Sequence, residues 1–293
     1  MNLSFILLLA FFGAASSQKL NQAENNDLQR ICGTQPRWPS KRFVDKSLDS
    51  LIDSNSTRRN IYNGIPTVGS KAPWSVRVFF GQMKCSATII SRRHVLTARH
   101  CLEMSPWKSS ILQGALYHAD STSQVYSGTF PDLSVNFPNG ERAAGSVLYL
   151  IDSLYKTTLE VDLLILELNT DLPLTATSFP VCVPKNTQEN RIGKQVHIYS
   201  YGGNVYDVDS GEGSGTLRYG TMKFSGIFYN RSRFQVYDKK FSTRPGDSGG
   251  GFLQDYNGRI HVVGVVQGGD AERSEGPLVG YYYNDICRLT GIC

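Results

Sequence analysis

The stretch Pro245–Gly251, which reads Pro-Gly-Asp-Ser-Gly-Gly-Gly, places Ser248 between glycines and directly after an aspartate. A serine that attacks a carbonyl needs a backbone that bends out of its path and N–H groups that face the developing oxyanion. Glycine meets both needs, because it lacks a Cβ and adopts conformations that other residues avoid. A Gly-rich β-turn with a solvated serine is the alternative. Since a serine hydroxyl is inert without a base, a histidine and a carboxylate elsewhere decide between the two.

Two upstream segments carry a candidate base and a candidate carboxylate. Val95–Cys101 is a strand-like run that leads to His100 beside a cysteine, which gives the imidazole the rigid mount that a general base needs. Val161–Leu168 is an apolar run with Asp162 near its start, where an unpaired carboxylate would be costly to bury. A structural histidine and a solvent-exposed aspartate are the alternatives. Together with Ser248, these residues predict a Ser-His-Asp triad in which Asp162 orients His100.

The composition predicts a globular chain with a substantial core. The 293 residues are 40% hydrophobic and 19% charged, which is not the balance of a disordered chain. The formal net charge is +5, and the lysines and arginines are scattered through the sequence. We therefore expect no nucleic-acid partner.

The N-terminus carries the only long apolar run, Leu3–Ala15. This run is shorter than the roughly 20 residues that a membrane-spanning helix needs, and small residues follow it. Residues 1–17 are therefore predicted to be a signal peptide with cleavage near Ser17, although no Lys or Arg precedes the apolar run. A buried N-terminal helix is the alternative. The prediction places the protein outside the cell as a secreted chain that is not bound to a membrane.

A secreted chain is expected to pair its six cysteines, although the sequence alone leaves several pairings open. They are Cys32, Cys85, Cys101, Cys182, Cys287 and Cys293. Asn55 and Asn230 each begin an Asn-X-Ser/Thr sequon, so both are candidate glycosylation sites.

Short β-branched runs separated by turn residues dominate the chain after Ile61. This pattern favours an all-β sandwich or barrel, and Tyr282–Leu289 is the best candidate for a helix there. Before Ile61 the sequence is polar, with a short helix within Gln18–Arg30 and an extended tether from Cys32 to Asn60. The expected strands include Ser75–Phe79, Ala87–Ile90, His94–Thr97, Val147–Ile151, Val161–Leu168, Gln195–Tyr201, Phe234–Val236 and Ile260–Val266.

The order His100, Asp162, Ser248 is one of the known triad orders, and with its contexts the chain resembles the chymotrypsin-like (trypsin-like, S1) serine peptidases. The resemblance covers about residues 61–293. Ile61–Gly64 resembles the family's Ile-Val-Gly-Gly start, and His197–Gly202 resembles its Gly-Trp-Gly strand. Val263–Val266 resembles the strand that leads into the substrate groove. The resemblance implies an all-β fold of two six-stranded antiparallel β-barrels, with the active site in the cleft between them and a short C-terminal helix.

The resemblance also assigns roles to the site residues. Ser248 would attack the peptide carbonyl, and His100 would take its proton and later give it to the leaving amine. Asp162 would orient His100, and the backbone N–H groups of Gly246 and Ser248 would form the oxyanion hole. Cleavage before Ile61 would free an ammonium group that pairs with Asp247 and activates the enzyme.

Under the same resemblance, residues 18–60 are a propeptide and tether, and residues 61–293 are the peptidase domain. The implied disulfides are Cys85–Cys101, Cys32–Cys182 and Cys287–Cys293. The bridge between Cys32 and Cys182 would keep the propeptide attached after activation.

Several positions depart from the family pattern. Asn60 precedes Ile61 where a Lys or Arg is usual, so an asparagine-directed enzyme or later trimming activates the chain, or it is not activated this way. Ser242 occupies the pocket position that is Asp in trypsins, so this position does not support a preference for Arg or Lys. Gln267 and Gly269 complete the expected substrate pocket, in a segment where the family usually shows Ser-Trp-Gly.

Two functions remain from the sequence. One is a secreted serine endopeptidase that is made as a zymogen and acts through an acyl-enzyme. The other is a catalytically impaired homologue that serves as a secreted protein-binding module. No cofactor and no metal are expected, because His94 and His100 have no partners at ligand spacing. The expected partners are a protein or peptide substrate, an activating protease and a secreted inhibitor, and the expected state is a monomer.

Overall fold

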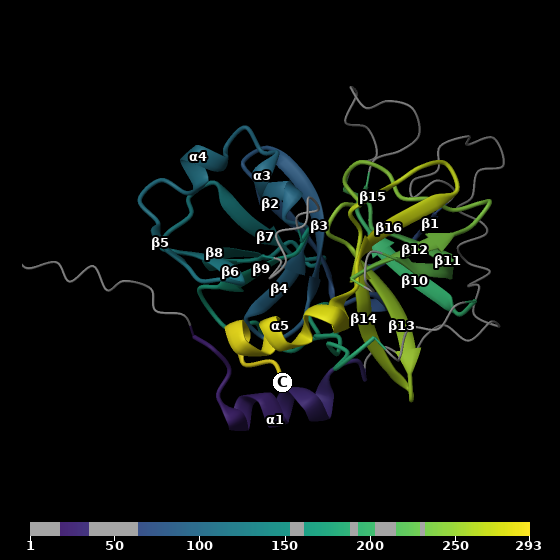
Figure 1. The fold of residues 1–293 in the computed structure, drawn as a ribbon, viewed down its shortest axis with the longest axis horizontal. Coiled ribbons are helices and arrows are strands. Elements are labelled where there is room, and N and C mark those ends of the chain that lie inside the picture. Colours follow the sequence, from purple (N-terminus) through teal and green to yellow (C-terminus); the bar gives the residue numbers. More distant parts are fainter. Residues whose placement is uncertain (1–17, 35–63, 153–160, 188–192, 203–214, 229–231) are drawn as a thin grey trace, which may run out of the picture.

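The structure is a computed structural model that describes residues 18–34, 64–152, 161–187, 193–202, 215–228 and 232–293. Two antiparallel sheets lie side by side, with helices on the outside (Figure 1). The predicted signal peptide, the asparagines of both sequons and Ile61 lie outside the described residues. Within the described residues, no helix is long and apolar enough to cross a membrane.

The first sheet closes into a six-stranded barrel. Its strands pair in the order β8, β7, β2, β3, β4, β9, and β8 also pairs with β9. A hairpin of β5 and β6 extends from β8. The strands are β2 (Ser75–Phe80), β3 (Met83–Ile89), β4 (His94–Thr97), β5 (Leu116–Ala119), β6 (Ser123–Ser127), β7 (Leu133–Asn136), β8 (Arg142–Ile151) and β9 (Leu164–Leu168).

Closure depends on a bulge in β8. The long strand pairs with β7 at its start and with β9 over the rest, and the register shifts between Gly145 and Val147. A Cβ on Gly145 would lie 2.4 Å from a methyl carbon of Leu166, so a side chain there would collide with the barrel core. The bulge therefore bends β8 at a point where the Leu166 side chain packs against the strand backbone, which requires a glycine at position 145.

The second sheet follows the order β14, β13, β10, β11, β12, β16. Among the described residues its two end strands are joined only by an isolated bridge between Gly264 and Leu278, so it forms a half-barrel. Short β1 pairs with β11, and β15 pairs with β16. The strands are β1 (Ile65–Pro66), β10 (Gln195–Ser200), β11 (Arg218–Phe228), β12 (Arg233–Tyr237), β13 (Gly251–Tyr256), β14 (Arg259–Val265), β15 (Gly268–Gly269) and β16 (Arg273–Pro277).

The predicted fold class is confirmed, with one difference in the second barrel. Three phenylalanines lie in its core: Phe224 stacks on Phe234, and Phe252 meets Phe234 edge-on. The Phe234 ring occupies the space that a side chain on Gly264 would need, with ring carbon Cε1 2.0 Å from the ideal Cβ position. The aromatic ring thus packs directly against the backbone of β14 at Gly264.

Short helices complete the fold. The C-terminal helix α5 (Tyr283–Thr290) was expected, whereas α1 (Gln22–Ile31) begins later than the sequence pattern suggested. These two helices lie next to each other (Figure 1), and the N–H of Leu20 donates to the carbonyl of Thr290 at 2.8 Å. The other helices in the described part of the chain are η1 (Gly69–Lys71), α3 (His100–Glu103), α4 (Lys108–Ile111) and η2 (Val279–Tyr282).

Buried contacts join the two sheets. Trp74 packs edge-on against Tyr199, and the Ser75 hydroxyl donates to the carbonyl of Tyr199 at 2.8 Å. The Tyr201 hydroxyl returns a hydrogen bond to the carbonyl of Ser75 at 3.1 Å. These contacts fix the relative position of residues that come from different sheets.

The three disulfides join the pairs that the family resemblance implied. Cys85–Cys101 links β3 to α3, and Cys287–Cys293 closes the C-terminus against α5. Cys32–Cys182 links the end of α1 to the segment before β10 across 150 residues of sequence. The N-terminal segment is therefore covalently held to the rest of the chain.

Candidate active site

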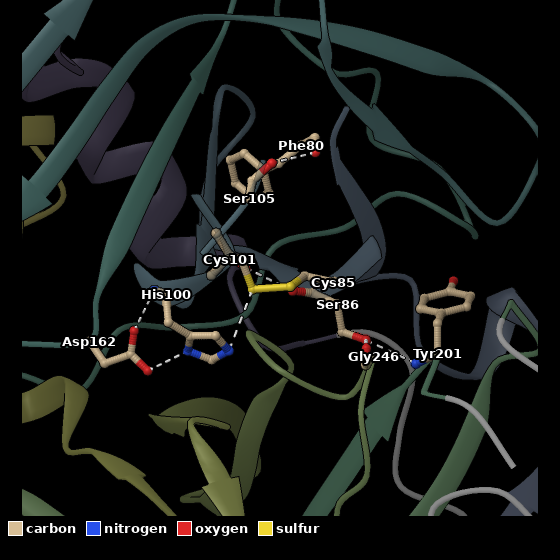
Figure 2. The surroundings of a disulfide bond; sticks show 10 residues. Phe80, Cys85, Ser86, His100, Cys101, Ser105, Asp162, Tyr201 and Gly246 are labelled. Atoms are coloured by element: carbon tan, nitrogen blue, oxygen red, sulfur yellow. Dashed lines mark hydrogen bonds and ion pairs between the residues drawn. A yellow bond between two sulfur atoms is a disulfide. The ribbon is translucent and has the colours of Figure 1, made fainter. Parts of the chain in front are cut away.

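His100 and Asp162 come together because β4 and β9 are neighbours. His100 begins α3 just after β4, and Asp162 precedes β9, which pairs with β4 through Thr97 and Leu164. The His100 Nδ1 atom lies 2.7 Å from Asp162 Oδ2, and the backbone N–H of His100 donates to Oδ1 at 2.8 Å. Figure 2 shows both carboxylate oxygens turned toward His100. The ring and the backbone of the histidine are thus held by one side chain.

The other ring nitrogen of His100 faces a different neighbour. Nε2 lies 4.0 Å from the sulfur of Cys101 (Figure 2), and no hydrogen bond between His100 and Ser248 occurs within the described residues. The base and its carboxylate are therefore assembled, whereas the contact between base and nucleophile is not made in this form.

The segment around Ser248 is clamped to the first barrel. The N–H of Ser86 in β3 donates to the carbonyl of Ser248, and the Ser86 hydroxyl donates to the carbonyl of Gly246, both at 2.8 Å. Gly246 and Gly249 adopt φ values of 91° and 83°, which disfavour other residues. A Cβ on Gly249 would lie 2.1 Å from the hydroxyl of Thr97 in β4. The glycines thus let this loop of the second sheet approach the strands that lead to His100.

The predicted oxyanion donors lie on this clamped loop. In the described part of the chain, the N–H groups of Gly246 and Ser248 donate no hydrogen bond, and both residues are partly exposed. Unpaired backbone donors are uncommon in folded proteins, since each one usually finds an acceptor. The two groups are therefore available to a ligand oxygen.

Asp247, between these two residues, is completely buried. Its Oδ1 accepts hydrogen bonds from the Ser200 hydroxyl at 2.6 Å and the Gly202 N–H at 2.9 Å, and its Oδ2 accepts one from the Arg244 N–H at 2.8 Å. Burial raises the pKa of Asp247 to about 6, although these hydrogen bonds oppose the rise. The carboxylate is thus fully hydrogen-bonded by neutral groups.

The predicted pocket residues lie near one another on neighbouring segments. Ser242 is fully buried, and its hydroxyl finds no partner among the described residues. Gln267 directly precedes β15, which contains the exposed Gly269, and its N–H donates to the carbonyl of Glu275 in β16 at 3.0 Å. Gln267 and Gly269 therefore lie at a short β-ladder, and Ser242 lies beneath the surface.

One contact beside Ser242, between Thr243 and Ser274, was missed from the sequence. The hydroxyl of Ser274 in β16 accepts hydrogen bonds from the Thr243 hydroxyl at 2.9 Å and from the Thr243 N–H at 3.1 Å. These bonds fasten the segment that directly follows Ser242. Two separated hydroxyl residues carry no sequence signal that would announce this contact.

Arg99, directly before His100, forms a second unexpected network. The guanidinium is nearly buried and pairs with Glu103 at 2.7 Å and with Asp152 at 2.5 Å. Burial lowers the pKa of Arg99, but the two carboxylates more than offset this effect and raise it. The unusual arginine is thus a structural support of the short helix that carries the histidine.

Comparisons with known proteins agree with this arrangement. CLIP domain-containing serine protease B4 from Anopheles gambiae is 21% identical over 246 residues, which cover 76% of this chain and 67% of that protein. The crystal structure of the scabies mite inactivated protease paralogue S-I1 matches with a TM-score of 0.58 and 21% identity, over 76% of this chain and 97% of that one. The Nematode trypsin-6-like family matches residues 2–293. Since that match spans nearly the whole sequence and the chain folds into a closed barrel and a half-barrel of the chymotrypsin type, it belongs to the Nematode trypsin-6-like family.

Proposed function

We propose that the protein is a secreted serine endopeptidase that hydrolyses peptide bonds through Ser248, His100 and Asp162. The observation that carries the proposal is the double hydrogen bond by which Asp162 holds the ring and backbone of His100. The membership in a trypsin-like family and the clamped loop around Ser248 support it. Secretion is supported by the three disulfides, which are characteristic of oxidising compartments.

The geometry suggests the role of each group in the reaction. The Ser248 hydroxyl attacks the carbonyl carbon and passes its proton to His100 Nε2, while Asp162 stabilises the resulting imidazolium. The oxyanion accepts hydrogen bonds from the backbone N–H groups of Gly246 and Ser248. Each such donor stabilises the transition state by roughly 3 kcal/mol in sites of this kind. His100 then protonates the leaving amine, and water attacks the acyl-enzyme by the same path. The hydrogen bond from Ser248 to His100 must form before the first step.

Activation would use the buried carboxylate of Asp247. Cleavage before Ile61 creates an α-ammonium, and a cation beside Asp247 would replace the neutral donors that now hold it. Such a buried ion pair is favourable only when both charged groups are present, because either charge alone would be costly to bury. We expect the rearranged loop to bring Ser248 and His100 into contact.

The alternative is a catalytically impaired homologue that binds a protein partner. Two observations favour it: no hydrogen bond joins Ser248 to His100 among the described residues, and a similar solved structure is that of an inactivated paralogue. Both functions are compatible with the same fold, so the state of Ser248 after cleavage distinguishes them.

The test is fluorophosphonate labelling of secreted protein before and after cleavage at the Asn60–Ile61 bond. An Asn60→Arg variant allows trypsin to cut at this bond, and N-terminal sequencing verifies the cut. Asn60→Gln is the control for the position of the cut, because trypsin cleaves it after Arg59 and leaves one residue before Ile61. We expect labelling only after cleavage and none in Ser248→Ala. A correctly cut and folded protein that takes up no label would contradict the endopeptidase and favour the binding module.

A further inference from the structure

Glu167 is a buried carboxylate that the proposed catalytic mechanism does not use. It is 1% exposed and lies on β9 directly across from His94 of β4. Its Oε2 accepts a hydrogen bond from the Tyr149 hydroxyl at 2.5 Å and lies 3.6 Å from His94 Nε2. Its Oε1 accepts a hydrogen bond from the backbone N–H of Gln18 at 2.9 Å. A carboxylate in such a place is costly unless a cation or strong donors balance its charge.

The neighbours of Glu167 donate hydrogen bonds to its carboxylate, but none of those described carries a positive charge at neutral pH. His94 is fully buried, and its Nδ1 is hydrogen-bonded to Ser91 Oγ at 2.8 Å. Burial lowers the pKa of His94, so the imidazole is neutral at neutral pH. Burial raises the pKa of Glu167, but His94, the Tyr149 hydroxyl and the Gln18 N–H together lower it, so the carboxylate is ionised. Within the described residues, His94 is the one side chain within ion-pair distance of Glu167.

Arg93, the residue before His94, already has carboxylate partners of its own. Arg93 pairs with Asp171 and with Glu24 of α1, both at 2.7 Å, and it also donates to the carbonyl oxygen of Gln18 at 3.3 Å. Its charge is thus balanced by two other carboxylates. The negative charge on Glu167 therefore has no cation of its own in the part of the chain that the structure describes.

The residues that follow Gln18 and lead into α1 are held in place by hydrogen bonds. The N–H of Leu20 donates to the carbonyl of Thr290 at 2.8 Å, and Asn21 caps the helix. The sequence predicts signal-peptide cleavage near Ser17. The nitrogen that contacts Glu167 is therefore the one that cleavage after Ser17 would turn into the N-terminus of the secreted chain.

We propose that signal-peptide removal leaves Gln18 as the first residue and that its α-ammonium forms an ion pair with the buried carboxylate of Glu167. In the cleavage, catalysed by a signal peptidase, water hydrolyses the Ser17–Gln18 peptide bond. Ser17 keeps the carboxylate, and the amine of Gln18 takes up a proton. The ammonium brings a positive charge and additional N–H donors to a position where the amide supplied one neutral donor. The inference rests on the secretion in the proposed function and is independent of catalysis.

This pair is separate from the proposed pair of Ile61 and Asp247. It would form on secretion, before any activating cut, and it would hold the start of the N-terminal segment to the first barrel. Cys32–Cys182 holds the other end of the same helix. The segment would thus be fixed at both ends whether or not the chain is activated.

The test measures the identity and the reactivity of the N-terminal amine. N-terminal sequencing and intact mass of the secreted protein give the first residue. The rate of acetylation of the α-amine as a function of pH, followed by mass spectrometry, gives its pKa. Two variants remove the pair in different ways: Glu167→Gln, and a chain with one alanine inserted before Gln18. The insertion keeps the Gln18 amide but moves the ammonium by about 3.8 Å.

We expect the wild-type chain to begin at Gln18 with an α-amine pKa at least one unit above its usual value of about 8. At pH 7, below both pKa values, its acetylation should be roughly tenfold slower than in either variant. Lys19 is exposed and serves as the internal control, since its labelling should be equal in all three proteins. Insertion of the alanine should lower the melting temperature in the Glu167 background and leave it unchanged in Glu167→Gln.

Three results would overturn the proposal: a secreted chain that begins at another residue, a Gln18 recovered as uncharged pyroglutamate, or an α-amine that reacts equally fast in all three proteins. If Glu167→Gln does not fold, the alanine insertion alone decides, because it retains every side chain of the site. Fluorophosphonate labelling of Ser248 is measured separately, so failure here does not depend on whether the enzyme is active.

Discussion

At the scale of single residues, the orientation of His100 follows from the chemistry of its partner. A carboxylate only accepts hydrogen bonds, so the Nδ1 atom that faces Asp162 must carry the ring proton. Nε2 is then left with a lone pair, which is what a base for Ser248 requires. The tautomer is therefore set by Asp162 before any substrate arrives.

The first prediction concerns Asp162→Asn. The amide has nearly the same shape, but its NH₂ group can turn toward Nδ1 and favour the opposite tautomer, in which Nε2 is protonated and cannot accept the serine proton. We expect the rate of fluorophosphonate labelling of the cleaved protein to fall by roughly 10⁴-fold, the size of this effect in a known triad. Circular dichroism should show an unchanged fold. A fall of less than tenfold would contradict the assigned role of Asp162.

The second prediction concerns Asp247 in the uncleaved protein. Its pKa is about 6 in the folded state, against about 3.9 in an unfolded chain. Between these values the folded state binds more protons than the unfolded state, so this group lowers the free energy of unfolding as pH rises from about 4 to about 6. The loss at neutral pH is about 3 kcal/mol.

Urea unfolding of wild type and Asp247→Asn at pH 4.5 and pH 7.5 measures this effect, since other titrating groups cancel in the comparison. We expect the wild type to lose more stability than the variant between the two pH values. Equal pH dependence of the two proteins would show that Asp247 keeps an ordinary pKa. In the cleaved protein, a cation at this carboxylate should abolish the difference.

At the scale of elements, the half-barrel is shaped by how closely β12 and β14 pack. Phe234 of β12 lies over Gly264 of β14, where a Cβ would come within 2.0 Å of its ring. Gly226 of β11 is a contrasting position, because nothing lies within 4 Å of the Cβ that would be added there. The two glycines of one sheet thus serve different purposes.

The third prediction compares alanine at these two glycines. Gly264→Ala should lower the free energy of unfolding by about 1–3 kcal/mol, because the stacked ring must shift within a packed core. Gly226→Ala is the matched control and should stay within about 0.5 kcal/mol of wild type. Urea unfolding measures both. If the two variants are equally stable, the contact with Phe234 does not determine the shape of the second barrel.

At the scale of the whole molecule, local sequence patterns predicted the fold and the residues of the candidate triad. They did not predict contacts between residues that are far apart in the sequence. His100, Asp162 and Ser248 each lie in a distinctive short context, and their order along the chain suggested the fold. The bond from Gln18 to Glu167 joins residues 149 positions apart, and no local pattern marks it. The half-barrel could not be predicted either, because closure of the second sheet depends on how its end strands pair. Contacts of this kind depend on strand register, which a single sequence does not reveal.

The last prediction concerns the disulfide Cys32–Cys182, which links the end of α1 to the segment before β10. Cys32–Cys182 closes a loop of 150 residues in the uncleaved chain, so a Cys32→Ser/Cys182→Ser double variant should be less stable by about 5 kcal/mol through the greater entropy of its unfolded state. After cleavage before Ile61, the bridge becomes the covalent link between the N-terminal segment and the peptidase domain. Cleaved wild type should then run as one band on a denaturing gel without reductant and as two bands with it, whereas the cleaved double variant should give two bands in both. Two bands from unreduced wild type would mean that the bridge does not form in the secreted protein, and the N-terminal helix would then be retained only by its noncovalent contacts.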